Sequence, residues 1–262
     1  MKLRSLLTPG LLIAGIMLPA IGQSSDKSIT ITSHTNVVPV VELYTSEGCS
    51  SCPPADQWLS QLGEALDENF RAVPLAFHVD YWNYLGWKDP YSSKQYTDRQ
   101  KDTAQKNRQR TIYTPQFTVT GRDTRGVHKV LERIRKANQQ MADVVASMRL
   151  TTMGDKVQIS LELENEYAAS HTNLYFALYE NDITRDIGAG ENHGRRLMHD
   201  YVVRHWSEAM RVNPGRYATS YDIVMPIDAV RTNLGVALVM VDKDTGDTVQ
   251  SMSTPIAALF ES

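Results

Sequence analysis

The chain contains two cysteines, and both fall in one tetrad, Cys49-Ser50-Ser51-Cys52. The β-branched run at 37–44, just before the tetrad, is typical of a buried central strand. After the tetrad, Pro53 and Pro54 suit a first helical turn, and apolar residues then recur with helical spacing as far as residue 66. The sequence therefore predicts a cysteine pair where a strand ends and a helix begins.

Two thiols at this spacing can form a disulfide, and a helix N-terminus stabilises a thiolate through its free N–H groups and its dipole. Thiol–disulfide exchange needs this arrangement, because one thiolate attacks a partner disulfide and the second thiol resolves the mixed disulfide. We expect Cys49 to attack and Cys52 to resolve, because Cys49 should be the more exposed and gain most from the helix dipole. A permanent structural disulfide is the disfavoured alternative, because so short a loop removes little entropy from the unfolded chain.

The periodicity of apolar residues changes at about residue 146. Before it, strand-like segments alternate with helix-like segments, which predicts an α/β domain over 37–145. The helices are expected after the tetrad, over 91–110 and along the apolar stripe at 127–141, and the later strands at 73–79 and 116–120. Beyond residue 146, apolar and polar side chains alternate, which predicts a β-rich, sandwich-like domain over 146–262. Its strands are expected near 157–163, 173–180, 197–206, 219–226, 234–241 and 247–254.

The N-terminus has the features of an export signal. A basic start is followed by a short apolar stretch at 11–18 and by small residues up to Gly22. We expect cleavage near Gly22, with residues 23–36 as a flexible leader, and a periplasmic or secreted mature protein; an uncleaved N-terminal anchor is the alternative. No later segment is apolar enough to span a membrane. The formal net charge of −3 provides no basic field for nucleic acid.

Several motifs together resemble a known family. The strand before the tetrad and the tetrad itself are similar to the active-site turn of glutaredoxins and thioredoxins, and Tyr113-Thr114-Pro115-Gln116 looks like the loop that faces the cysteines in that fold. More specifically, the chain resembles an exported bacterial thioredoxin-like family known as domain of unknown function 1223. The segments that carry this resemblance include 78–82, 85–90, Arg99-Gln100, 113–116, 190–192 and 199–204.

The resemblance implies a thioredoxin-like α/β domain followed by an antiparallel β-sandwich-like domain. It also implies a cis peptide bond between Thr114 and Pro115, packed against the cysteine pair, so both residues are catalytic candidates beside Cys49 and Cys52. The Ser-Ser dipeptide between the cysteines differs from thioredoxin, so the redox potential does not carry over.

Other residues have two interpretations each. His78, at the end of a buried strand, is a metal ligand, a proton shuttle or, in the favoured reading, a hydrogen-bonded structural histidine. Tyr81 and Trp82 belong to an aromatic-rich loop, either a cluster that covers the loop or a platform that binds substrate; Tyr84 and Trp87 complete it. Glu42 is a buried proton acceptor or, as strand alternation favours, an outward carboxylate. Asp89 and Arg99 are a possible surface ion pair, and the resemblance also marks the polar residues Glu191, Asn192, His199, Asp200 and Arg204.

These observations favour an exported thiol–disulfide oxidoreductase that acts on protein or small-molecule thiols and disulfides, without a cofactor. The alternative is a binding protein, either a copper carrier that uses Cys49, Cys52 and His78 or a redox-inert adaptor. Two cysteines exclude a Cys₄ zinc site. The substrate-contacting candidates are Trp82, Tyr81 and His78.

Overall fold

The computed structural model describes residues 27–165, 171–212 and 215–261. Strands dominate it, and three α-helices occur in these ranges. The helices are α1 (Pro53–Glu64), α2 (Lys94–Lys106) and α3 (Val127–Asn138). The strands are β1 (Ser28–Thr32), β2 (Val40–Thr45), β3 (Val73–His78), β4 (Gln116–Val119), β5 (Arg122–Asp123), β6 (Val144–Met153), β7 (Lys156–Asn165), β8 (Thr172–Glu180), β9 (Ile183–Asp186), β10 (Arg196–His199), β11 (Val202–Trp206), β12 (Met210–Val212), β13 (Gly215–Val224), β14 (Leu234–Asp242) and β15 (Thr248–Pro255).

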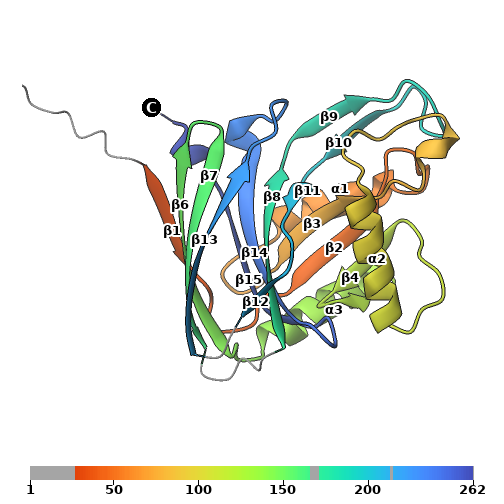
Figure 1. The fold of residues 1–262 in the computed structure, drawn as a ribbon. Helices are drawn as coiled ribbons and strands as arrows, with labels where there is room; N and C mark the ends of the chain where they lie inside the picture. The colour runs from red at the N-terminus through yellow and green to blue at the C-terminus, as the bar shows by residue number, and fades with distance from the viewer. Residues whose placement is uncertain (1–26, 166–170, 213–214, 262) are drawn as a thin grey trace, which may run out of the picture.

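One mixed sheet runs through both halves of the chain in the order β15-β14-β8-β11-β3-β2-β4-β5, with β12 paired to β8. β2 and β3 are parallel, and β11 continues the sheet parallel to β3 through Val202 and Ala76. A second, antiparallel sheet has the order β1-β6-β7-β13, and β9 pairs with β10 in a separate hairpin. Figure 1 shows α2 at the end of the molecule far from the four-stranded sheet, and α3 beside β4.

The two sheets pack through apolar side chains that alternate along their strands. On the four-stranded sheet, Met148, Leu150 and Ile159 are fully or almost fully buried, and Phe176 and Leu238 belong to the same cluster from β8 and β14. Alternation of this kind buries one face of a strand and leaves the other free. The residues between them on β8 and β14, such as Ala177 and Val239, belong to a different cluster on the other face of the large sheet.

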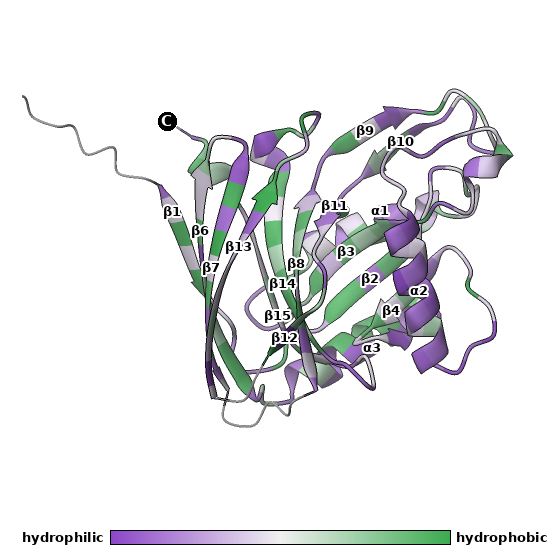
Figure 2. Cartoon of the chain, viewed as in Figure 1, coloured by the Kyte–Doolittle hydropathy of each residue, from purple (hydrophilic) through white to green (hydrophobic). Residues whose placement is uncertain are grey.

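Strands β2 and β3 are buried on both faces, because helices cover both sides of this part of the sheet. Leu59 of α1 and Ile134 of α3 pack with one face of β2, and Tyr96 of α2 packs with the other face. Every residue of β2 and of β3 is buried. Figure 2 shows the contrast between the hydrophobic β2 and the mostly hydrophilic α2. This double cover fixes the end of β2, where the cysteines lie.

The expected fold class is wrong. The structure is mostly β, and no separate thioredoxin-like α/β domain is evident, because β2, β3 and β4 belong to the same sheet as β8, β11, β14 and β15. The helices and most of the strands are nevertheless close to where the periodicity placed them. The domain boundaries stay a prediction.

Two smaller expectations are also corrected. Residues 28–32, expected within a flexible leader, form β1, because Ile29 and Ile31 pack against the sandwich core while the strand pairs with β6. The single strand expected at 197–206 is interrupted at Asp200 and Tyr201, which separates β10 from β11. The predicted signal peptide at 1–22 lies outside the described residues.

Candidate redox site

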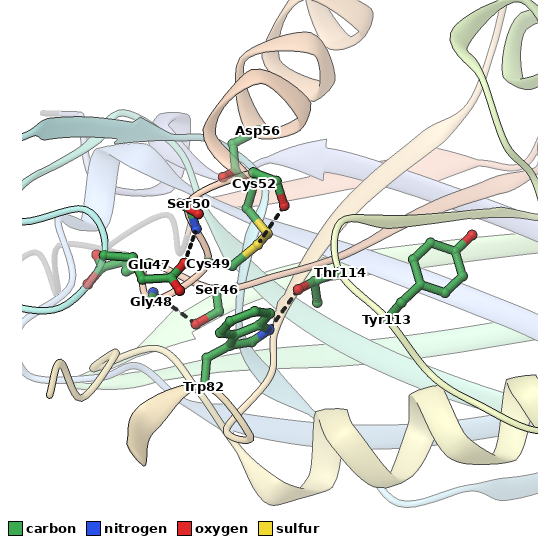
Figure 3. The surroundings of a disulfide bond; sticks show 12 residues. Ser46, Glu47, Gly48, Cys49, Ser50, Cys52, Asp56, Trp82, Tyr113 and Thr114 are labelled. Carbon is green, nitrogen blue, oxygen red and sulfur yellow. Dashed lines mark hydrogen bonds between the residues drawn. A yellow bond between two sulfur atoms is a disulfide. The ribbon is translucent and has the colours of Figure 1, made fainter. Parts of the chain in front are cut away.

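The cysteine tetrad forms the turn between β2 and α1, and Cys49 and Cys52 are joined by a disulfide. Cys52 is the N-cap of α1, and its backbone N–H donates to the carbonyl of Cys49 at 3.2 Å. The hydroxyl of Ser51 lies 3.4 Å from Cys49 Sγ. Both cysteines have a relative exposure of 0%, so the expectation that Cys49 is the more exposed is wrong. Figure 3 shows the disulfide with Asp56 on one side and with Trp82 and Thr114 on the other.

The start of α1 offers the cysteines no free backbone N–H group. Its first two positions are Pro53 and Pro54, which lack the N–H, and the next two N–H groups, of Ala55 and Asp56, both donate to the carbonyl of Cys52. The four N–H groups that a helix normally leaves free are therefore missing or used. The expected stabilisation of a thiolate by such groups is not available here, and only the helix dipole remains.

The segment before β4 lies on another side of the disulfide. The peptide bond between Thr114 and Pro115 is cis, as predicted. The hydroxyl of Thr114 accepts a 2.7 Å hydrogen bond from the indole N–H of Trp82, and Figure 3 shows both residues beside the disulfide. The buried side chain of Gln100 on α2 holds this segment by donating to the Tyr113 carbonyl at 2.8 Å.

Charged side chains are buried behind the cysteine turn. Nδ1 of His78, at the end of β3, lies 2.7 Å from Asp89 Oδ2, and both side chains have 0% exposure. Burial by itself lowers the pKa of His78, but the charge and hydrogen bond of Asp89 outweigh it and raise this pKa to about 9. Burial likewise opposes ionisation of Asp89, but the His78 charge holds the pKa of this carboxyl below its ordinary value. The structural interpretation of His78 therefore fits, and His78 presents no surface to a substrate in solution.

The loop between β9 and β10 holds the cysteine turn in place. The side-chain amide of Asn192, fully buried, donates to the carbonyls of Glu47 at 2.9 Å and Cys49 at 3.0 Å. Glu191 Oε2 accepts a 3.2 Å hydrogen bond from the backbone N–H of Ser50. Two of the residues marked by the resemblance, distant in sequence, thus contact the tetrad directly.

The remaining residues marked by the resemblance divide into two groups. His199, at the end of β10, joins the buried charges, with Nε2 at 3.6 Å from Glu47 Oε1. Arg204 lies elsewhere, paired with Glu180 and, at 2.7 Å, with Asp228. Asp200 accepts a hydrogen bond from the backbone N–H of Asp182 and so stabilises a turn.

Glu42 is not the outward carboxylate that alternation favoured. It is only 3% exposed, and it pairs with the Arg99 guanidinium and accepts hydrogen bonds from Tyr44 at 2.8 Å and Thr118 at 3.0 Å. The reason is that α2 covers the face of β2 that would otherwise meet solvent. Burial opposes the charge of Arg99, but Glu42 outweighs it and raises the pKa of the guanidinium. The expected pair of Asp89 with Arg99 is also wrong, since each has another partner.

The aromatic loop after β3 is half-buried and lies near the site. Tyr81 and Trp82 are partly buried, whereas Tyr84 is 80% exposed. Trp87 donates its indole N–H to Glu47 Oε2 at 2.7 Å and so belongs to the buried side of the site. The loop therefore both covers the site and presents aromatic surface to solvent.

Sequence reasoning missed Glu47, Asp56 and Arg185. Asp56 is 5% exposed on α1, and its Oδ2 lies 3.9 Å from His199 Nδ1; Arg185 Nε lies 3.7 Å from Glu47 Oε1. One signal for Asp56 was present, because an acidic residue three positions before Leu59 stands on the apolar face of the helix. In the described part of the chain, no group of three His, Cys, Asp or Glu side chains is arranged to hold a metal ion.

Comparison with known proteins supports the fold and gives the family. A crystal structure of protein AGR_C_4864 from Agrobacterium tumefaciens is similar, with 26% identity and a TM-score of 0.61 over 85% of this chain and 96% of that chain. HBP35 of Porphyromonas gingivalis shares the fold at 15% identity and a TM-score of 0.64, over 85% of this chain and 76% of that chain. No curated protein matches.

The described helices are all too short or too polar to cross a membrane. A family model described as a protein of unknown function, DUF1223, matches residues 40–241, which include the cysteine turn, the Thr114-Pro115 segment and the loop that carries Asn192. The match covers most of the chain, and the chain belongs to the DUF1223 family.

Proposed function

We propose that this protein is a thiol–disulfide oxidoreductase whose Cys49–Cys52 disulfide is reversibly reduced. The observation that carries the proposal is the disulfide itself, formed by two cysteines three residues apart at the N-cap of α1 and surrounded by buried titratable side chains. A permanent stabilising disulfide needs neither the short loop nor the charged surroundings. The signal-like N-terminus supports action outside the cytoplasm, where disulfides persist.

The reaction follows from thiol–disulfide exchange. In the reduced protein the Cys49 thiolate attacks a substrate disulfide R–S–S–R, which forms a Cys49–S–S–R bond and releases one R–S⁻. Cys52 then attacks Cys49 Sγ, which forms the Cys49–Cys52 disulfide and releases the second R–S⁻. Each released thiolate takes a proton, so the substrate gains two electrons and two protons. Because both cysteines are fully buried, an incoming disulfide must displace part of the cover, such as Trp82 and Thr114, which Figure 3 shows beside the disulfide.

The test is to equilibrate the purified protein in glutathione buffers and to measure the Cys49–Cys52 pair by alkylation and mass. We expect one two-electron transition, together with catalysed reduction of a model protein disulfide that Cys49→Ser abolishes. A pair that stays oxidised at every glutathione ratio, without turnover, would identify a redox-inert protein.

Trapping of mixed disulfides shows which of the two thiols attacks and which resolves. Cys52→Ala should accumulate mixed disulfides at Cys49, because the resolving thiol is missing. Trapping by Cys49→Ala instead would reverse the roles.

A further inference from the structure

One polar cluster holds most of the unpartnered buried polar atoms in the described part of the chain. It is formed by the buried residues Glu47, Asp56, His78, Asp89, Asn192 and His199 and by the partly exposed Arg185. Among the described residues, nine buried side-chain nitrogen or oxygen atoms have no hydrogen-bond partner. Six of them belong to this cluster: Glu47 Oε1, His78 Nε2, Arg185 Nε, Asn192 Oδ1, and His199 Nδ1 and Nε2. Buried polar atoms in folded proteins nearly always have a partner, so six unpartnered atoms in one place indicate a functional role.

His199 lies between two carboxylates without being hydrogen-bonded to either. Its Nε2 is 3.6 Å from Glu47 Oε1, and its Nδ1 is 3.9 Å from Asp56 Oδ2. The two imidazoles are also neighbours, since the rings of His78 and His199 meet edge to face at 5.1 Å between centroids. Of the two, His78 is hydrogen-bonded to Asp89, whereas neither ring nitrogen of His199 has a hydrogen-bond partner.

Asp56 connects this cluster to the disulfide. It stands four residues after Cys52 on the same helix, and side chains at this spacing lie on one face. Figure 3 shows Asp56 next to Cys52. Burial raises the pKa of Asp56, and His199 and His78 act in the opposite direction. A carboxyl group with a raised pKa takes up and releases a proton nearer to neutral pH.

A solvent cavity reaches the same two residues from outside. It has a volume of about 430 Å³ and lies between α1 and β10, with Gln57 and Gln61 on one side and Met198 on the other. Asp56 and His199 both line it. Asp56 thus has Cys52 on its own helix face on one side and a route to water on the other.

We propose that Asp56 accepts the proton that Cys52 releases when it resolves a mixed disulfide, and that His199 passes this proton between Asp56 and the solvent cavity. The inference rests on the proposed oxidoreductase function. In the step, Cys52–SH and the Asp56 carboxylate become a thiolate and a carboxylic acid. The thiolate attacks Cys49 Sγ, the Cys49–S–R bond breaks and R–S⁻ leaves. The proton on Asp56 then moves through His199 to water.

A base next to Cys52 compensates for the absence of free N–H groups at the start of α1. With Pro53 and Pro54 at the first two positions, the helix cannot stabilise a thiolate by donating hydrogen bonds. Of the other carboxylates in the cluster, Asp89 is hydrogen-bonded to His78, and Glu47 accepts a hydrogen bond from Trp87. Asp56 is the one that shares the helix of Cys52, and His199 is the imidazole beside it.

The experiment follows two thiols separately. Reduced protein is mixed with an aromatic disulfide reagent whose thiolate absorbs visible light, and the absorbance is recorded in a stopped-flow instrument. The first, bimolecular phase reports attack by Cys49, and the second, concentration-independent phase reports resolution by Cys52. We expect Asp56→Asn to slow the second phase by about tenfold to a hundredfold near neutral pH, with the first phase changed less than about twofold. The difference in second-phase rate between Asp56→Asn and the wild type should become smaller as pH rises, because hydroxide takes the place of the missing base.

The controls separate a proton acceptor from a structural carboxylate. Glu132→Gln removes an exposed carboxylate from α3, away from the cavity, and should leave both phases unchanged. Asp56→Glu should restore much of the rate, and His199→Gln should slow the second phase less than Asp56→Asn does. In a Cys49→Ser background, Asp56→Asn should lower the pKa of the lone Cys52 thiol, because a nearby carboxylate no longer opposes its charge. Slower resolution from a more acidic thiol is the signature of a lost proton acceptor.

The inference is overturned if Asp56→Asn leaves the second phase at the wild-type rate, if it slows both phases equally at all pH values, or if the wild-type protein releases no second equivalent. Both phases belong to a single reaction of the reduced protein with the reagent, so they can be measured without catalytic turnover. A relay confirmed here in a protein that reduces no model substrate would mean that the proposed function fails while the proton route stands.

Discussion

The indole N–H of Trp82 donates a 2.7 Å hydrogen bond to Oγ1 of Thr114, and this contact joins the loop after β3 to the segment before β4. Both residues lie beside the disulfide (Figure 3), whose two cysteines have no exposed surface. The contact therefore closes one side of the site, and a substrate must break it or approach past it.

Thr114→Val should accelerate reduction of the disulfide by a small thiol. The substitution keeps the side-chain shape but removes the acceptor for Trp82, and a neutral hydrogen bond contributes about 0.5–1.5 kcal/mol. We expect the rate of reduction by dithiothreitol to rise about twofold to tenfold, and Trp82→Ala to raise it further. Alkylation at timed intervals measures the rate. Thr254→Val, at a partly exposed position on β15, is the control; an unchanged rate in both site variants would show that Trp82 and Thr114 do not limit access.

The buried pair of His78 and Asp89 should make the protein less stable as the pH becomes alkaline. The folded-state pKa of His78, about 9, lies above its ordinary value of 6.5. A group shifted in this direction stabilises the fold fully below about pH 6.5 and loses its contribution as pH rises through about 9. His78→Gln should lower the unfolding free energy by about 3–5 kcal/mol below pH 6.5, because Asp89 stays buried without its partner.

Urea unfolding at a series of pH values measures this effect. The difference between the wild type and His78→Gln should shrink as pH rises from about 6.5 to about 9 and change little above that. His171→Gln removes a histidine from a half-exposed pair with Asp244 and should cost less than about 1 kcal/mol. A difference that stays constant from neutral to alkaline pH would contradict the assignment of a charged His78.

Local periodicity predicted the elements better than their assembly. The alternation along 157–163 and the stripe at 127–141 correspond to β7 and α3, because each pattern is set by neighbours in the chain. The pairing of β3 with β11 joins Ala76 to Val202 and leaves no mark in either segment. The same limit explains why the burial of Glu42 was not predicted, because α2 covers it only through tertiary packing. A thioredoxin-like domain was therefore expected where one continuous sheet exists.

The candidate site was predictable in part for the same reason. Spacing alone identified Cys49 and Cys52, and the resemblance marked Asn192 and His199 without saying what they contact. Asp56 stood four residues after Cys52 and still went unnoticed, because an acidic residue in a first helical turn is ordinary. Only the fold shows that β10 brings His199 against it.

The ion pair of Glu42 and Arg99 should show strong coupling in stability. The two side chains are 4% and 16% exposed, and Arg99 also stacks on Trp206, with 4.3 Å between the guanidinium carbon and the ring centroid. Glu42→Leu and Arg99→Met should each lower the unfolding free energy by about 3–5 kcal/mol, because each leaves a buried charge unpaired. The double variant should be more stable than the sum of the two losses predicts.

Chemical denaturation of the four proteins gives the coupling energy. Arg122→Met, which breaks a half-exposed pair with Asp247, should cost less than about 1 kcal/mol. Strictly additive losses in the double variant would mean that the pair does not act as a unit. Thiol reactivity should be unchanged in all of them, since Glu42 faces α2 and not the disulfide.

Asn192→Ala should loosen the cysteine turn more than it affects the rest of the sheet. The Asn192 amide donates to the carbonyls of Glu47 and Cys49, and its loss leaves two buried acceptors unpaired, at about 1–3 kcal/mol each. We expect faster amide hydrogen exchange in the oxidised protein over 46–52 and 187–195, with the centre of β14 unchanged. Asn69→Ala, at an exposed turn, should leave exchange in these segments as in the wild type. If exchange rises equally in β14, Asn192 stabilises the whole fold; if it rises nowhere, the loop between β9 and β10 does not hold the turn.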